Sequence, residues 1–110
     1  MASAFKRKLS QSVGTTLTSV GSYTVGASTQ VTVIGLVLAN TLATAITADV
    51  TVYDGATDTY VIKSCPIAAG ASAVVVGGEQ KIVLEPGDSI RVKSSDAASV
   101  DVVMSILELT

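Results

Sequence analysis

The chain has 110 residues, 48% hydrophobic and 15% charged, a balance that excludes a disordered protein and fits one domain with a single core. One Phe and three Tyr are its only large aromatic residues, and this Val- and Thr-rich composition favours strands over helices. The net charge is −2, and three of the seven positive charges are Lys6, Arg7 and Lys8. The chain therefore lacks the broad basic face of a general nucleic-acid-binding protein.

Residues 1–12 are polar and basic, with Phe5 and Leu9 as their large apolar side chains. No apolar h-region follows them, so they do not read as a signal peptide, and the most apolar run, 31–39, is too short to span a bilayer. We expect a protein made in the cytoplasm that does not associate with membranes. We also expect residues 1–12 to form a short basic arm, either a solvated tail or a tether on an acidic neighbouring subunit.

From residue 13 to residue 110, short apolar or alternating stretches follow one another between turn residues, the pattern of a single all-β sandwich domain. Residues 30–41 are apolar on both alternating sets, which is typical of a central strand. In 44–54, every second residue is apolar and expected to point inward: Ile46, Ala48, Val50 and Val52. The whole pattern predicts about eight strands in an antiparallel two-sheet, jelly-roll-like sandwich, at 15–26, 30–41, 44–54, 59–63, 74–76, 82–84, 89–92 and 99–110.

Glu85-Pro86-Gly87-Asp88 predicts a tight turn between two of these strands. Proline presets φ at the second turn position, and glycine accepts the positive φ of the third. The turn could close a hairpin or carry the chain from one sheet to the other, and the local pattern is the same for both.

The last strand, 99–110, points Val100, Val102, Met104 and Ile106 to one side, and its second side becomes more apolar towards Leu107 and Leu109. A second apolar side on a strand requires cover from a neighbour. We therefore expect a homo-oligomer.

The residue types of common catalytic and metal sites are scarce. There is no histidine, which removes the commonest general base and metal ligand. The single cysteine, Cys65, lies in the apolar stretch "VIKSCPIAAG" and is expected to be a small core residue rather than a nucleophile. We expect no enzymatic activity, no catalytic residue, no metal and no cofactor.

The Asp-Gly pair at the start of 54–58 predicts a hairpin turn. Asp54 and Asp58 could offer oxygens to Ca²⁺, and with Tyr53 and Tyr60 they are the candidates for a receptor or carbohydrate site. The alternative, which we favour, is that Asp54 starts the turn and Asp58 caps the loop, because the further ligands of a calcium loop are missing.

Several stretches, read in order, resemble a group of small virion structural proteins of tailed bacteriophages, common in marine and cyanobacterial phages. The shared pattern comprises "GLVLAN", "YVIK", "PIAAG", "LEPGDSIRV" and "SVDVVMSILE", and covers about residues 12–109. The resemblance implies a non-enzymatic sandwich present in many copies on the virion, with the major capsid protein or other virion proteins as partners. It brings no catalytic residues.

On this resemblance we expect a capsid decoration or cement protein that stabilises the shell by subunit contacts. The alternatives are a neck, collar or tail ring component, or a receptor- or carbohydrate-binding module. The residues expected at the interface are Phe5, Lys6, Arg7, Lys8, Leu9, Leu107 and Leu109.

Overall fold

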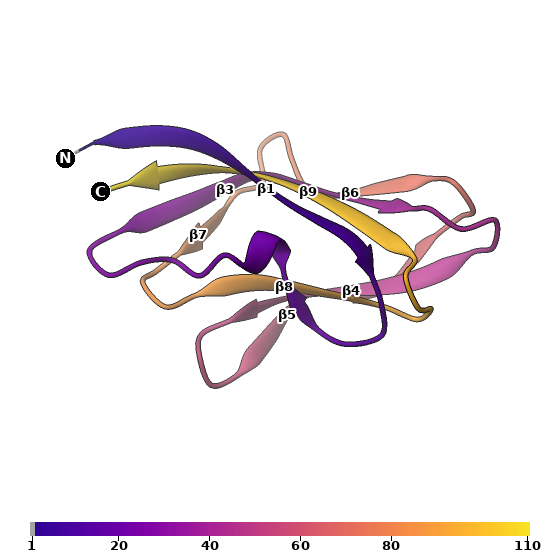
Figure 1. Ribbon diagram of the computed structural model, residues 1–110. Coiled ribbons are helices and arrows are strands. Elements are labelled where there is room, and N and C mark those ends of the chain that lie inside the picture. Colours follow the sequence, from indigo (N-terminus) through magenta and orange to yellow (C-terminus); the bar gives the residue numbers. More distant parts are fainter. Residues whose placement is uncertain (1) are drawn as a thin grey trace.

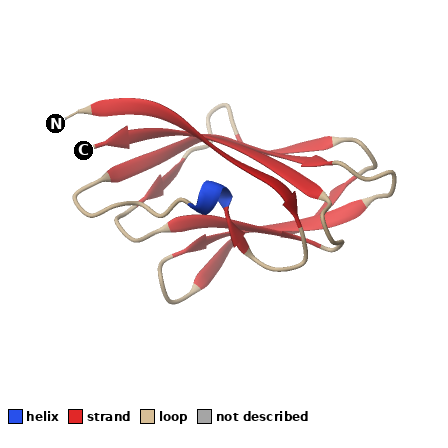
Figure 2. Cartoon of the chain, viewed as in Figure 1, coloured by secondary structure: helices blue, strands red, loops and turns tan. Residues whose placement is uncertain are grey.

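The computed structural model describes residues 2–110 and consists of two antiparallel sheets packed face to face (Figures 1 and 2). Its elements are β1 (Ser3–Val13), β2 (Thr18–Ser19), the 3₁₀ turn η1 (Val20–Ser22), β3 (Gln30–Asn40), β4 (Ile46–Tyr53), β5 (Asp58–Ile67), β6 (Ser72–Val76), β7 (Ile82–Leu84), β8 (Ser89–Ser94) and β9 (Val100–Leu109). The prediction of an all-β antiparallel sandwich is confirmed.

Each of the two sheets has four strand positions. Sheet A runs β1-β9-β3-β6, with β7 also pairing β3, and sheet B runs β2-β8-β4-β5. Strand β6 pairs with 36–39 of β3 and β7 pairs with 31–33, so these two short strands occupy one position beside the long central strand. The nine strands therefore fill eight positions in two four-stranded layers, and the chain changes sheet at most connections, as in a jelly roll.

The core lies between the sheets and is built from the alternating side chains of the central strands. In β9 the predicted inward set is buried, Val100, Val102, Met104 and Ile106, and in β4 Ile46, Ala48 and Val50 are buried while Val52 is partly buried. Since successive residues of a strand point to opposite faces, this set fixes the outward direction of the others.

The turn Glu85–Asp88 carries the chain between sheets, because β7 pairs with β3 in sheet A and β8 pairs with β4 in sheet B. The Asp88 N–H donates to the Glu85 carbonyl at 3.0 Å, and Gly87 has a φ of +92°. This settles the alternative that the sequence left open. Gly87 is needed because an L side chain is strained at that φ.

Residues 15–26, expected as one strand, form only the short β2 followed by η1. Gly21 interrupts the strand with a φ of +61°. A Cβ at Gly21 would lie 2.9 Å from the Lys8 Cβ, and its N–H donates to the Ser10 hydroxyl at 2.8 Å. The segment turns inward against β1 and closes the gap between the two sheets.

The expected N-terminal arm is corrected by the structure: residues 3–13 form strand β1, at the edge of sheet A. It pairs with β9 from Ser3↔Leu109 to Ser10↔Val102, with a bulge before Val13. The two chain ends lie side by side (Figure 1), with hydrogen bonds of 2.9 and 2.8 Å between Ala2 and Thr110. The arm prediction failed because a strand at an edge buries little apolar surface, so its sequence can be polar and basic.

Candidate functional site

The outer face of sheet A, turned away from sheet B, carries two apolar rows that run across the strands. Residues opposite one another in antiparallel strands point to the same side of the sheet. The pairing thereby places Phe5, Leu107, Thr32 and Val83 in one row, and Leu9, Val103, Val37 and Val74 in another. We call these the Phe5 row and the Leu9 row.

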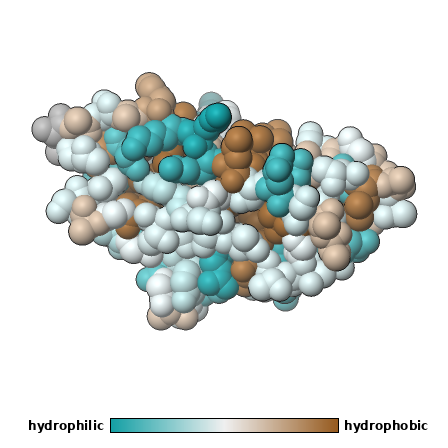
Figure 3. Space-filling view, viewed as in Figure 1, coloured by the Kyte–Doolittle hydropathy of each residue, from teal (hydrophilic) through white to brown (hydrophobic). Residues whose placement is uncertain are grey.

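These rows are unusually exposed for their composition. Phe5 is 77% exposed, Val74 and Val83 are each 68%, Leu9 is 48% and Val103 is 47%. They are five of the six exposed large hydrophobic side chains of the described chain, and the sixth, Tyr60, is on sheet B. Figure 3 shows apolar side chains, in brown, along the side of the molecule that sheet A forms, interrupted by polar groups. Such a concentration on one face is typical of an interaction surface.

A polar row lies between the two apolar rows and contains Arg7, Ser105 and Gly35, which the pairing places opposite one another. Gly35 follows a β-bulge, because the register of β3 against β9 shifts between Val33 and Gly35. A Cβ there would meet only the Ser105 side chain, at 3.8 Å, an ordinary contact. A glycine on a strand can mark a place where another molecule's backbone comes close.

Lys6 and Lys8 point to the opposite side of β1 from Arg7, because they pair with the inward residues Ile106 and Met104. The Lys6 ammonium lies 2.8 Å from Glu108 Oε1, and the Tyr23 hydroxyl donates to Glu108 Oε2 at 2.5 Å. The Lys8 Nζ lies 4.5 Å from the centre of the Tyr23 ring. These contacts form a cluster, the Glu108 cluster, which joins β1 to β9 and to the segment after η1.

The pKa values in the Glu108 cluster follow from these contacts. Hydrogen bonds from Lys6 and Tyr23 lower the pKa of Glu108 below its ordinary value. Burial raises the pKa of Tyr23, and the hydrogen bond to the Glu108 carboxylate raises it further. The cluster is thus held in one protonation state, with Glu108 charged and Tyr23 neutral at pH 7.

The predicted interface residues therefore separate into two groups. Phe5, Arg7, Leu9, Leu107 and Leu109 belong to the outward set of sheet A. Lys6 and Lys8 are engaged within the chain, which leaves Arg7 as the basic side chain of that segment on the outer face.

Three of the exposed large apolar residues of the face were not among the predicted interface residues: Val74, Val83 and Val103. Val103 could have been found from its alternation with Val102 and Met104 in β9. Val74 and Val83 could not, because they lie in short strands, "SAVVV" and "IVL", whose apolar residues do not reveal an outward side.

The hairpin at 54–58 uses its polar groups within the chain. Asp54 Oδ1 accepts from the N–H of Ala56 at 2.9 Å and of Thr57 at 2.7 Å, which lowers the Asp54 pKa, so Asp54 starts the turn. Asp58 accepts from the Thr51 hydroxyl at 2.7 Å, and its Oδ1 lies 3.3 Å from the Arg91 Nε. Asp58 is the first residue of β5, so it holds the strands together and does not cap the loop.

Each of the two tyrosines beside this hairpin has a cation over one face of its ring, and Tyr60 is still 47% exposed. The Arg91 guanidinium lies 4.1 Å from the Tyr53 ring centre, and the Lys63 ammonium lies 5.2 Å from that of Tyr60. A sugar ring that stacked on one of these faces would have to displace the cation. Within residues 2–110, no group of three or more His, Cys, Asp or Glu side chains could hold a metal ion.

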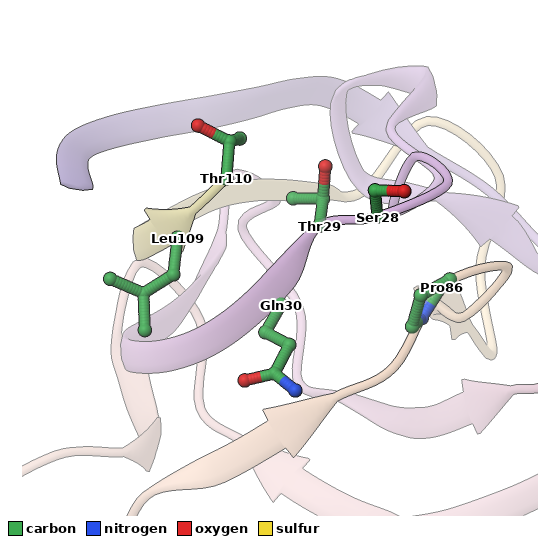
Figure 4. A pocket seen from close by; sticks show the side chains of 6 residues that line it. All are labelled: Ser28, Thr29, Gln30, Pro86, Leu109 and Thr110. Atoms are coloured by element: carbon green, nitrogen blue, oxygen red, sulfur yellow. The ribbon is translucent and has the colours of Figure 1, made fainter. Parts of the chain in front are cut away.

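Cys65 is a free thiol on β5, opposite Ala48, and is partly buried against the core rather than fully enclosed. At the other end of the molecule a shallow pocket of about 260 Å³ lies between the corner turn and the C-terminus (Figure 4). It is lined by Ser28, Thr29, Gln30, Pro86, Leu109 and Thr110, a set with no charged side chain. Of the helical segments in the described residues, none is long and apolar enough to cross a membrane.

Comparison with known proteins identifies the fold and no family. No protein-family model matches the chain, and no curated protein does. A solved structure of Bacillus endospore appendages, described as disulfide-linked pili, is similar over 96% of this chain and 86% of that chain, with a TM-score of 0.54 and 16% identity. At that identity the likeness shows the fold alone.

Two further solved structures have TM-scores below 0.5 and carry no argument. The match to the virus-like particle of the extra small virus of the prawn Macrobrachium rosenbergii covers 98% of this chain and 80% of the particle's chain, at 16% identity and a TM-score of 0.45. The match to murine APRIL covers 94% of this chain and 100% of the APRIL chain, at 13% identity and a TM-score of 0.46. None of the three is a tailed-phage protein, so the resemblance to phage virion proteins stays a prediction.

Proposed function

We propose that this chain is a non-enzymatic structural protein of a bacteriophage virion, and that it decorates the capsid and stabilises it through subunit contacts. The observation that supports this most is the outer face of sheet A. The sandwich has a complete core on the inner side of that sheet, yet five large apolar side chains remain exposed on the outer side. A folded monomer gains nothing from them, whereas an assembly subunit can bury them.

Such a protein acts by adding favourable interaction free energy at the contacts between subunits. Burying apolar surface contributes about 25 cal/mol per Å², less the entropy lost on association. A face with several hundred Å² of apolar surface would therefore supply a few kcal/mol per copy, and many copies would strengthen a shell held together by modest interfaces. The chemistry of the described residues agrees with this role, since their polar clusters are engaged in holding strands together.

A neck, collar or tail ring component is the alternative within the virion. It would bury this face against a different surface of the next copy, because a ring joins two different patches of identical subunits. The number of copies per particle separates the two. The receptor- or carbohydrate-binding alternative is less well supported, because the tyrosines and carboxylates near 53–60 are already paired within the chain.

Quantitative mass spectrometry of purified phage particles, normalised to the major shell protein, tests this proposal. Hundreds of copies per particle would support a shell decoration, whereas a dozen or so would place the protein in a neck or tail ring. Absence from the particles of a phage that encodes the chain would reject the virion proposal.

A further inference from the structure

We propose that the outer face of sheet A binds the same face of a second copy of this chain, about a two-fold axis that runs parallel to the strands between β9 and β3. This deepens the proposed function by naming the partner of the face, and it rests on that proposal only for the use of the face in assembly. The arrangement follows from how the exposed side chains are distributed over the four strand positions.

The exposed side chains stand mainly at the two edges of the face. Phe5 and Leu9 are on β1, at one edge, and Val83 and Val74 are on β7 and β6, at the other. A two-fold axis parallel to the strands exchanges the two edges and keeps the rows in place. Phe5 of one copy then meets Val83 of the other, and Leu9 meets Val74, while Val103 meets Val37 in the centre.

The middle row fits the same operation. Ser105 and Gly35 exchange places across the axis, so the smallest side chains of the face lie where the two copies come closest. A Cβ would fit at Gly35 within the chain itself, so no close contact inside the chain requires a glycine there. The second copy supplies one, because backbones can approach closely over glycine and serine.

The charges of the face also complement one another in this arrangement. Arg7 is the cation at the β1 edge of the middle row. The operation places it against the loop between β6 and β7, residues 77–81, which carries Glu79 and which rises on the outer side of sheet A (Figure 1). Lys81, in the same loop, donates to the Gly78 carbonyl of its own loop, which leaves Glu79 as the loop's carboxylate for the partner.

The area is enough for a dimer of the smaller kind. From their exposed fractions, the five side chains together present on the order of 600 Å² per copy, which is near the lower end of the area that stable interfaces bury on each partner. Two sheets packed face to face with nearly aligned strands are a usual way to bury such surfaces.

A different two-fold axis, perpendicular to the strands, would fit less well. It would reverse the rows and, if centred on the middle row, would place Arg7 of one copy against Arg7 of the other. Pairing two copies through their free β1 edges brings the same repulsion, because Lys6, Arg7 and Lys8 lie at the middle of that edge. Like charges at these places disfavour both arrangements.

The first experiment is sedimentation equilibrium of the full 110-residue chain, whose monomer is 11.1 kDa. We expect a dimer with a micromolar or tighter dissociation constant. Phe5→Asp should weaken it about thirtyfold or more, by placing a charge in the apolar contact. Tyr60→Asp is the matched control, since Tyr60 is also an exposed aromatic residue on an edge strand, in sheet B, and it should leave the dimer unchanged.

Charge exchange tests the middle row. Arg7→Glu and Glu79→Arg should each weaken the dimer about fivefold, and the double variant should recover most of the loss. If the double variant lost as much affinity as the two single variants lose together, the Arg7–Glu79 contact would be contradicted.

Cysteine crosslinking tests the axis, in a Cys65→Ser background. Within one chain Leu9 and Val74 are three strand spacings apart, roughly 14 Å, too far for a disulfide. The double variant Leu9→Cys, Val74→Cys should form crosslinked dimers on oxidation, whereas Leu9→Cys alone should not. Crosslinking by Leu9→Cys alone would overturn the proposed axis.

A chain that remains monomeric at hundreds of micromolar would overturn this inference outright. If that monomer were still found in many copies on virions, the proposed function would stand and the face would have a virion protein as its partner. If the chain dimerised as proposed but was absent from virions, the inference would stand and the proposed function would fail.

Discussion

Replacing Glu108 with glutamine should destabilise the fold measurably at neutral pH, because Glu108 joins β1 to the rest of the protein. The substitution removes the charge that the Lys6 ammonium faces at 2.8 Å and weakens the acceptor of the Tyr23 hydroxyl at 2.5 Å. Lys6 is half-exposed, so its ion pair is worth less than about 1 kcal/mol. The hydrogen bond from Tyr23 to a charged acceptor contributes about 1 kcal/mol more, for a total cost of about 1–2 kcal/mol.

Thermal unfolding followed by circular dichroism measures this cost. For a domain of this size, 1 kcal/mol corresponds to a shift in Tm of roughly 4 °C, so Glu108→Gln should lower Tm by roughly 4–8 °C at pH 7. Glu79→Gln removes an exposed glutamate in the 77–81 loop of the same protein and serves as the matched control, with a shift near zero when measured on the monomer.

The pH dependence gives a second readout. The Glu108 pKa is lowered in the folded state, so its contribution is present above the unfolded value near 4.5 and is lost as the pH falls through the lower, folded value. The difference between wild type and Glu108→Gln should therefore shrink at acid pH. The Tyr23 pKa is raised, so its contribution is full below the unfolded value near 10 and falls as the pH rises above it.

Equal Tm values for wild type and Glu108→Gln at pH 7 would refute the reasoning. So would a difference that stayed constant from pH 7 to below pH 4, because it would show that the charge of Glu108 is not what stabilises β1. A double-mutant cycle with Tyr23→Phe should give a coupling energy of about 1 kcal/mol.

Asn40→Ala should lower the free energy of unfolding by about 2–4 kcal/mol, measured by urea unfolding. The buried Asn40 amide donates to the Thr44 carbonyl at 2.8 Å and accepts from the Leu42 N–H at 2.9 Å, and both hydrogen bonds would be lost. A loss below about 1 kcal/mol would contradict this. Deleting residues 2–10 should lower Tm and abolish the dimer, since it removes most of β1; an unchanged Tm would mean that this segment is a passive tail after all.

Only some residues of the candidate surface could be predicted from the sequence. Phe5, Leu9, Leu107 and Leu109 were expected at an interface because they are apolar residues in otherwise polar or terminal segments. Their partners at the other edge, Val74 and Val83, have the same residue type as the core around them. Which valines face outward depends on strand pairing across 37 to 51 residues of chain, and no local period encodes it.

The prediction of an N-terminal arm was wrong for a different reason. Lys6, Arg7 and Lys8 suggested an arm outside the fold, either a solvated tail or a tether, because three consecutive charges are usually exposed to solvent. In the structure two of them are used within the chain, and the third faces outward from an edge strand. Strand β1 is held by a partner nearly a hundred residues away, so its own sequence carries little sign of it.

By itself, the sequence determined the class of the fold. Its β-branched composition, the alternation in 46–52 and 100–106 and the turn residues at 54–55 and 86–87 were enough for an antiparallel sandwich of about eight strands, because these features depend on periods of two residues and on local φ preferences. Only the tertiary structure decided that the corner at 85–88 passes between sheets, that β1 completes sheet A, and that five apolar side chains gather on one outer face. Those outcomes depend on which distant strands pair and in what register, and pairing is a property of the whole chain.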